Sequence, residues 1–221
     1  MSISRDMTTG MYILQTKILG VLDTNPGKDK PYHNNQHMQG VWDIVQKLWV
    51  FERDTDDPVE NERSLTILMI ASLLHDYDHS GGETSDHYNV LRTREFVEEL
   101  LKNGGLGVSD DIRFAVDSAI ACTEYPFIIE PSCHLEKVLR DADILYAALS
   151  LNPHIIMEDL RAEITVAAKR PISYQEMLNG QLKFMDSVVL YTTTGKGIWD
   201  RNSQQYLKLL TNYVNEKEAP E

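Results

Sequence analysis

The stretch that decides the fold is residues 65–76, LTILMIASLLHD, an apolar run that ends in a histidine and an aspartate. A helix that is apolar on all sides is expected at the centre of a protein. Ionisable groups at the buried end of such a helix are costly unless they have a partner or bind a metal. The run therefore predicts a central buried helix, Leu65–Leu74, with a paired or metal-binding end at His75 and Asp76.

Apolar side chains recur at three- and four-residue spacing on both sides of this run, which predicts further helices. The expected ranges are 11–23, 34–51, 86–101, 109–123, 135–149, 153–168, 173–191 and 200–214. Residues 54–62 are acidic and hold Pro58, so we expect a solvated connection there, with Asn61 capping the next helix. Long runs of alternating polar and apolar residues, which would indicate a sheet, are missing from the sequence. We expect an all-α protein with one domain over residues 1–221, a motif-bearing core of about 32–199 and a charged tail of about 215–221.

Composition limits the partners of this chain. Its 221 residues include 21 Lys and Arg against 34 Asp and Glu, a formal net charge of −13. Such a charge repels duplex nucleic acid and anionic membranes, so we expect neither as a partner. A small anionic substrate would need a cation in its binding site. The two cysteines and the lack of an apolar stretch of about 18 residues favour a cytoplasmic protein. The sequence leaves the oligomeric state open.

Four of the seven histidines lie in two short clusters. The first is YHNNQH, residues 32–37, in which His33 and His37 are four apart and share one side of a helix start. The second is HDYDH, residues 75–79. His75 alone would more often be a satisfied core histidine, but together with Asp76 and His37 it favours a metal site. Imidazole and carboxylate ligands together suit zinc, iron or manganese, with magnesium bound through carboxylate oxygen.

A complete metal site needs a further carboxylate, and the segment 138–149 offers two. Asp141 and Asp143 are two residues apart, about 200° around a helix, so they cannot share a face. Asp143 lies on one stripe with Leu139 and Ala147, and we expect this buried stripe to supply the ligand. Asp141 lies on the opposite side and is expected to be a surface or capping acid.

The ordered set of His37, His75-Asp76 and Asp143 resembles the signature of the HD superfamily of metal-dependent phosphohydrolases. Two longer motifs, YHNNQH at 32–37 and HDYDHSG at 75–81, are similar to those in the catalytic domain of class I cyclic nucleotide phosphodiesterases. That family also carries a Gln-x-x-Phe on a late helix, which QLKF at 181–184 matches. The resemblance covers roughly residues 32–199 as scattered motifs.

The resemblance implies a compact helical HD-type fold with a metal site between central helices. It implies two divalent ions: one tightly bound zinc, iron or manganese, and a second magnesium or manganese bridged by Asp76. The implied ligands of the tight ion are His37, His75, Asp76 and Asp143.

Further roles follow from the same resemblance. His33 would be the general acid, and His79 would order a nearby water. Tyr32 would pack beside the site, Gln181 would read a purine base and Phe184 would clamp it. The implied substrate is a small nucleotide, with hydrolysis of a 3′,5′-cyclic nucleotide to the 5′-monophosphate first among reactions.

Several departures from the family pattern leave alternatives open. Gly40 stands where the family has an acid, Thr84 falls near the place of an Asn, and the interval between Asp76 and Asp143 is shorter. A nucleotide phosphomonoesterase of the HD superfamily is the close alternative, and a non-catalytic nucleotide-binding HD module is another. At the level of single residues, Tyr32 and Phe184 also suit a hydrophobic core, Gln181 a surface position and His79 a loop facing water.

Overall fold

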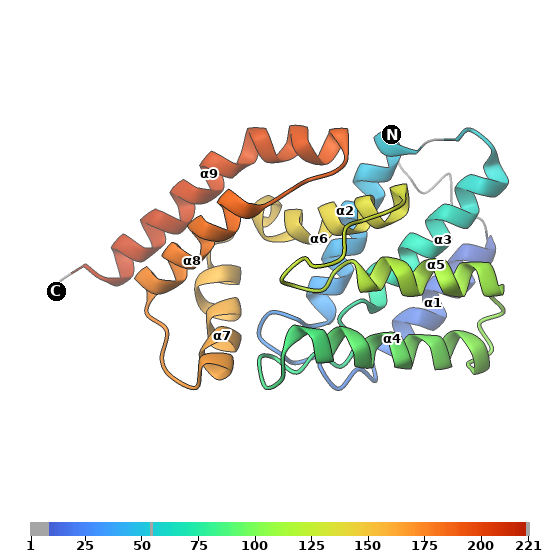
Figure 1. The fold of residues 1–221 in the computed structure, drawn as a ribbon, viewed down its shortest axis with the longest axis horizontal. Coiled ribbons are helices and arrows are strands. Elements are labelled where there is room, and N and C mark those ends of the chain that lie inside the picture. Colours follow the sequence, from blue (N-terminus) through green and yellow to red (C-terminus); the bar gives the residue numbers. More distant parts are fainter. Residues whose placement is uncertain (1–8, 54, 220–221) are drawn as a thin grey trace.

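The computed structural model describes residues 9–53 and 55–219, and within these ranges the chain is helical and without strands (Figure 1). The expectation of an all-α protein is therefore confirmed. Both ends of the predicted 1–221 domain, residues 1–8 and 220–221, lie outside the described residues. The helices are α1 (Thr9–Leu22), α2 (Asn35–Glu52), α3 (Pro58–Leu74), α4 (Asp86–Asn103), α5 (Asp110–Ala121), α6 (His134–Ser150), a π-helical segment (Ile155–Leu160), α7 (Arg161–Ala168), α8 (Tyr174–Ser187) and α9 (Thr193–Lys217).

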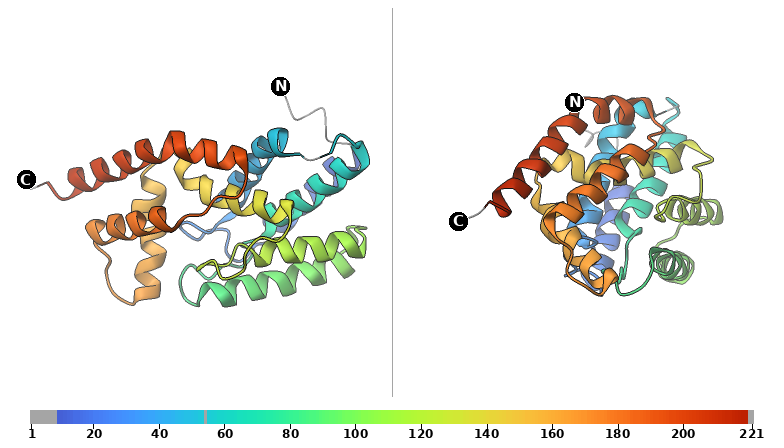
Figure 2. Two further views of the ribbon diagram at one scale, coloured as in Figure 1. Left: turned by 45° about the horizontal axis from the view of Figure 1, so that its top comes forward. Right: turned by 60° about the vertical axis from the view of Figure 1, so that its left-hand side comes forward.

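Helix α3 is the centre of the main core, as the apolar run 65–74 predicts. Every residue from Ser64 to Leu74 is buried. Helices α1, α2, α5 and α6 all pack against α3, and α2 also lies along α6. Helix α4 runs beside α5 on the outside of this group, which both figures show (Figures 1 and 2). The polar end of α3 is therefore held inside the helical body.

The connection predicted over residues 54–62 is shorter than expected, because α3 begins at Pro58. Asp57 caps the helix by accepting a hydrogen bond from the backbone N–H of Val59 at 2.9 Å. Proline is well suited to the first turn, where its missing N–H has no partner to lose. The predicted cap, Asn61, instead accepts a hydrogen bond from the indole of Trp49 at 2.7 Å.

The C-terminal helices form a second apolar cluster beside the main core. The π-helical segment, α8, α9 and the end of α6 contribute its buried side chains, and Figure 2 shows α8 and α9 covering one end of the molecule. Helix α9 begins at Thr193, earlier than the predicted residue 200, and α8 ends at Ser187 rather than 191. Gly195 and Gly197 weaken the helical pattern at the start of α9 in the sequence. None of the described helices is both long and apolar enough to cross a membrane.

Candidate metal centre and its cavity

The first turn of α2 brings His37 to the end of α3. Asn34 caps α2, and its side-chain oxygen accepts hydrogen bonds from the backbone N–H groups of Gln36 and His37 at 2.9 and 3.0 Å. The helix therefore begins at Asn35, and His37 lies in its first turn. His75 directly follows the last residue of α3. Both imidazoles are about 1% exposed.

Four predicted ligands meet at this point. The Nε2 atoms of His37 and His75 are 3.2 Å apart. Asp76 Oδ2 lies 3.2 Å from the Nε2 of His37 and 3.0 Å from that of His75, and Asp143 Oδ1 lies 3.2 and 3.7 Å from the same two atoms. Ligand atoms about 2.1 Å from one ion stand about 3.0 Å apart at right angles and about 3.4 Å apart at the tetrahedral angle. The spacing suits one divalent ion.

The donor set also fits a cation chemically. Nδ1 of His75 donates to the backbone carbonyl of Ser72 at 2.9 Å, which leaves an Nε2 lone pair facing the other ligands. This outer hydrogen bond is the usual way in which proteins orient a metal-binding histidine. Nδ1 of His37 is buried without a hydrogen-bond partner among the described residues. His37, His75 and Asp143 form a group whose ligand atoms all lie within 4.8 Å of one another, and this group can hold a metal ion.

The electrostatics of the cluster favour positive charge. Burial opposes the charged form of His75, but the Asp76 and Asp143 carboxylates outweigh it and raise the His75 pKa well above its ordinary value. Burial likewise opposes ionisation of the two acids, yet the neighbouring imidazoles hold the pKa of Asp76 and that of Asp143 well below their usual range. The field that draws a proton to His75 also attracts a divalent cation.

The structure corrects the expected burial of the two α6 acids. Asp141 is completely buried, whereas the Asp143 side chain is 21% exposed and opens toward a cavity. Asp141 is not a surface acid; it accepts hydrogen bonds from the backbone N–H and the hydroxyl of Thr192 at 2.8 and 2.7 Å, at the start of α9. The cap of α9 is Thr192, whose hydroxyl oxygen accepts the backbone N–H of Gly195 at 2.9 Å, so Asp141 supports the capping residue and is not itself the cap. Helix α6 packs against both α2 and α9, so its two sides are covered and no single stripe is the buried one.

The structure explains why a glycine stands at position 40. A Cβ atom at this position would lie less than 3.0 Å from the ring of Tyr146 on α6. The Tyr146 ring in turn packs edge-on against His37, with ring centroids 4.6 Å apart. An aromatic side chain thus takes the space that an acidic side chain at position 40 would need, and it covers the candidate ligand His37 on that side.

Glu163 is the site residue that the sequence did not reveal. Its Oε1 accepts the backbone N–H groups of Tyr32 and His33 at 2.8 and 3.0 Å, and its Oε2 is 2.5 Å from Nδ1 of His33. Burial opposes protonation of His33, but this hydrogen bond and nearby carboxylates raise the His33 pKa above its ordinary value. Glu163 belongs to none of the sequence motifs and lies 130 residues from His33 in the chain. The sequence therefore offers no signal for its role beyond its place in a helical pattern.

His79 lies against this pair rather than facing bulk water. Its residue exposure is 4%, and its ring centroid is 3.8 Å from that of His33. Nδ1 of His79 accepts the backbone N–H of Gly81 at 3.1 Å, while Nε2 is 2.8 Å from the Asn89 amide nitrogen and 3.5 Å from Asp86 Oδ1. Burial lowers the pKa of His79, and the neighbouring His33 lowers it further.

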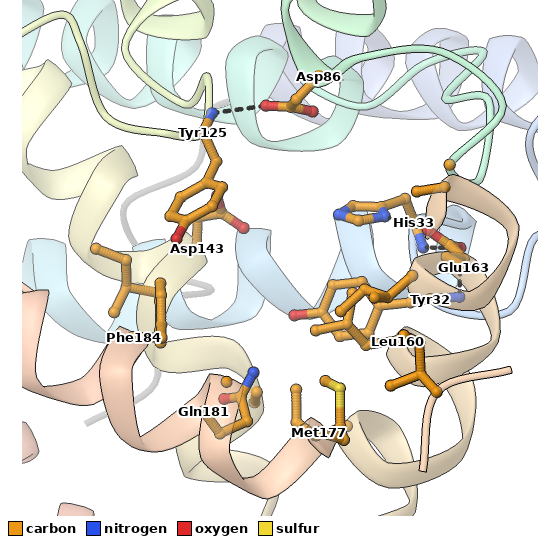
Figure 3. Close-up of a pocket in the computed structure, with 18 of the residues that line it drawn as sticks. Tyr32, His33, Asp86, Tyr125, Asp143, Leu160, Glu163, Met177, Gln181 and Phe184 are labelled. Atoms are coloured by element: carbon orange, nitrogen blue, oxygen red, sulfur yellow. Dashed lines mark hydrogen bonds and ion pairs between the residues drawn. The ribbon is translucent and has the colours of Figure 1, made fainter. Parts of the chain in front are cut away.

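Two of the candidate metal ligands, Asp76 and Asp143, and the His33–Glu163 pair line one cavity of about 840 Å³. Figure 3 shows Tyr32, His33 and Glu163 on one side of it, Asp143 and Phe184 on the opposite side, and Gln181 below. Further lining is largely apolar and comes from α6, the π-helical segment, α7, α8 and α9: Ile144, Leu160, Ile164, Met177 and Trp199.

The two predicted base-binding residues line this cavity. Gln181 is 8% exposed, and its side-chain oxygen accepts a hydrogen bond from the Tyr206 hydroxyl at 3.3 Å, so it is not a surface amide. Phe184 is half-buried and packs near Tyr125, with ring centroids 6.0 Å apart. Tyr32 lies beside the candidate metal ligands, its ring centroid 5.0 Å from that of His37.

No protein-family model matches this chain, and no curated protein is significantly similar to it in sequence. What the site does is therefore inferred from its own geometry and from the motifs described above. Two features carry most of that inference: a buried cluster of histidines and aspartates that fits a divalent ion, and a large cavity beside it.

Proposed function

We propose that this protein is a metal-dependent phosphohydrolase that opens a 3′,5′-cyclic nucleotide to the 5′-monophosphate. The observation that carries the proposal is the convergence of His37, His75, Asp76 and Asp143 at the edge of a cavity that also exposes a His33–Glu163 pair. Metal ligands beside a positioned proton donor are the two parts that phosphodiester hydrolysis requires.

The four ligands would hold one tightly bound zinc, iron or manganese ion, and Asp76 would share a second magnesium or manganese ion. Divalent ions in such a site make water acidic enough to act as a nucleophile near neutral pH and offset the negative charge of a phosphate. The second effect matters here, because a chain with a net charge of −13 otherwise repels an anionic substrate.

His33 is suited to donate a proton. Its Nδ1 is held by Glu163, its raised pKa favours the imidazolium form, and the residue lines the cavity. When water attacks phosphorus, the bond from phosphorus to the 3′ oxygen breaks, and the His33 proton passes to that oxygen. Positioned proton donation typically contributes about 10²–10⁴-fold. Glu163 would not touch the substrate; it is a positioning residue.

The far side of the cavity suits a flat, apolar ligand with a few polar edge groups. Tyr206 holds the Gln181 amide by its oxygen, and Figure 3 shows this amide directed at the cavity. Phe184 and the surrounding aliphatic side chains supply apolar faces. Ligand pockets of this kind take most of their affinity from apolar surface and their orientation from one or two polar groups. A purine base meets both requirements.

A nucleotide phosphomonoesterase is the second candidate. The residues around the ligand on α6 read ADILYA, 142–147, which resembles the generic HD form rather than the pattern of the cyclic nucleotide enzymes. A monoesterase uses the same metal ligands, so this candidate differs in substrate rather than in site. A non-catalytic binding module has less support, because all four ligand positions are kept.

One assay separates these candidates. Manganese-loaded protein would be offered cyclic AMP, cyclic GMP and the matching nucleoside monophosphates in parallel, with a chelator control and metal analysis of the sample. Chelator-sensitive ring opening supports the diesterase, and phosphate release from monophosphates alone supports the monoesterase. Bound metal without turnover of any phosphoester would overturn both.

A matched pair of variants ties the activity to the cluster. Asp76→Asn should abolish turnover and remove bound metal, because it deletes a charge shared by both ions. Asp78→Asn is the control: Asp78 lies two residues away, outside the cluster, and has a positive φ of 59° that asparagine also tolerates. Equal loss of activity in the two variants would count against the assignment.

A further inference from the structure

A second group of metal-ligand atoms lies beside the first. His33, His79 and Glu163 each offer one atom to a group in which all atoms are within 4.8 Å of one another. Oε2 of Glu163 is 2.5 Å from Nδ1 of His33 and 3.9 Å from Nδ1 of His79. Two imidazoles and one carboxylate are a usual protein ligand set for zinc, with further positions left to water.

The carboxylate is oriented for this purpose by the backbone. Oε1 of Glu163 accepts the N–H groups of Tyr32 and His33, so Oε2 is the oxygen that faces the two rings. The Glu163 side chain is 3% exposed, and the site can be reached through the cavity that all three residues line. A buried carboxylate with one oxygen anchored loses little freedom when the other binds an ion.

The second nitrogen of His79, Nε2, lies 2.8 Å from the amide nitrogen of Asn89 and 3.5 Å from Asp86 Oδ1. Metal-ligating histidines commonly donate this N–H to a carboxylate, and Asp86 is the acceptor within reach once Nδ1 binds an ion. An ion bound at Nδ1 would replace the hydrogen bond that this atom accepts from the backbone of Gly81 at 3.1 Å. The ion would also widen the 2.5 Å gap between His33 and Glu163 to about 3 Å.

We propose that His33, His79 and Glu163 form a separate Zn²⁺ site, and that zinc bound there inhibits the enzyme. The entering ion displaces the Nδ1 proton of His33, which leaves through the cavity to solvent, and forms bonds to both histidines and to Glu163. His33 then keeps only the N–H on its other nitrogen, and this group is a much weaker acid than an imidazolium. The binding part stands on geometry alone, whereas the inhibition rests on the proposed function.

Equilibrium dialysis of the metal-free protein against Zn²⁺, followed by metal analysis, tests the binding. The wild type should bind one more ion per chain than either Glu163→Gln or His79→Asn. His154→Ala is the matched control, because His154 is an exposed histidine paired with a different acid, Asp159; it should bind as many ions as the wild type. Circular dichroism and thermal melting identify any variant that fails to fold. Wild-type stoichiometry in both folded site variants would overturn the proposal.

The inhibition is tested on manganese-loaded protein. Added Zn²⁺ should slow hydrolysis of a cyclic nucleotide, whose leaving group needs a proton, more than that of an activated aryl phosphodiester, which does not. In the Glu163→Gln variant, added Zn²⁺ should no longer slow the residual hydrolysis of the cyclic nucleotide more than that of the aryl phosphodiester. Equal slowing of both substrates would mean zinc acts at the catalytic ligands, and would overturn the inhibitory role. The dialysis experiment measures zinc binding without any turnover, so it tests the zinc site independently of the proposed function. If the proposed function is wrong, the protein will be inert toward every phosphoester whatever the dialysis shows.

Discussion

Gly82 is the position at which a single methyl group should disturb the proton donor without touching a metal ligand. Its φ is +90°, and an added Cβ would lie less than 3.0 Å from the carbonyl oxygen of Glu163 and 3.1 Å from the backbone nitrogen of Ala167. Both obstacles are backbone atoms of α7. Gly82→Ala must therefore move the loop or the helix by several tenths of an ångström.

The magnitude follows from two terms. The unfavourable φ costs about 1–3 kcal/mol and the overpacking about 1–3 kcal/mol, so the variant should lose about 2–6 kcal/mol of stability. At about 2–4 °C per kcal/mol for a chain of this size, the melting temperature should fall by at least about 4 °C. A displaced α7 also loosens the hold of Glu163 on His33, and a misplacement of about 1 Å can lower a rate about 10²-fold.

Thermal melting and steady-state kinetics measure the two effects. We expect kcat/KM for a cyclic nucleotide to fall about 10–100-fold, with a smaller loss on an activated aryl phosphodiester and unchanged metal content. Gly20→Ala is the control, because Gly20 lies within α1 with nothing within 4 Å of an added Cβ; it should be neutral or slightly stabilising. Wild-type melting and kinetics in Gly82→Ala would refute the role assigned to this close packing.

Three further outcomes are expected. His33→Ala should keep the metal at the cluster of His37, His75 and Asp143 but slow cyclic nucleotides far more than aryl esters, and equal losses in a kinetic comparison would exclude His33 as general acid. Gln181→Ala should change base preference or affinity with metal content intact, and unchanged affinity for every nucleotide would remove Gln181 from the base site. The pKa of Glu158 is lowered to about 2, because its hydrogen bonds with Tyr174, Tyr213 and Arg161 outweigh the effect of burial. Ionised Glu158 should therefore stabilise the fold above its unfolded pKa of about 4.5. That stability should be lost as pH falls from about 4.5 to about 2, so Glu158→Gln should flatten the acid limb of urea-unfolding curves.

Much of the fold follows from apolar periodicity in the sequence. The run 65–74 predicts the buried α3 because so uniform a helix has no polar face to turn toward water. Helix ends were less predictable where local signals compete. Asp57 and Asn61 both resemble caps, and only packing decides between them, since the side chain of Asn61 is taken by Trp49.

The acids of α6 show why burial is harder to predict than helix formation. Their spacing correctly separates Asp141 from Asp143, because two residues apart on a helix means opposite sides. It does not say what covers each side. Tyr191 and Thr192, about 50 residues later in the chain and just before α9, cover Asp141 and donate hydrogen bonds to it, while the cavity leaves Asp143 partly open.

The sequence by itself determined the helical class and the His75-Asp76 pair at the end of the buried helix α3, because periodicity and local motifs lie within a few turns of chain. Tertiary structure alone decided that Glu163 holds His33 and faces His79, that Tyr146 occupies the space beside Gly40, and that Gln181 is held by Tyr206. These contacts join residues distant in the chain through the packing of α6, α7 and α9 around one cavity. No short-range pattern encodes such contacts, since each depends on where a whole helix comes to rest.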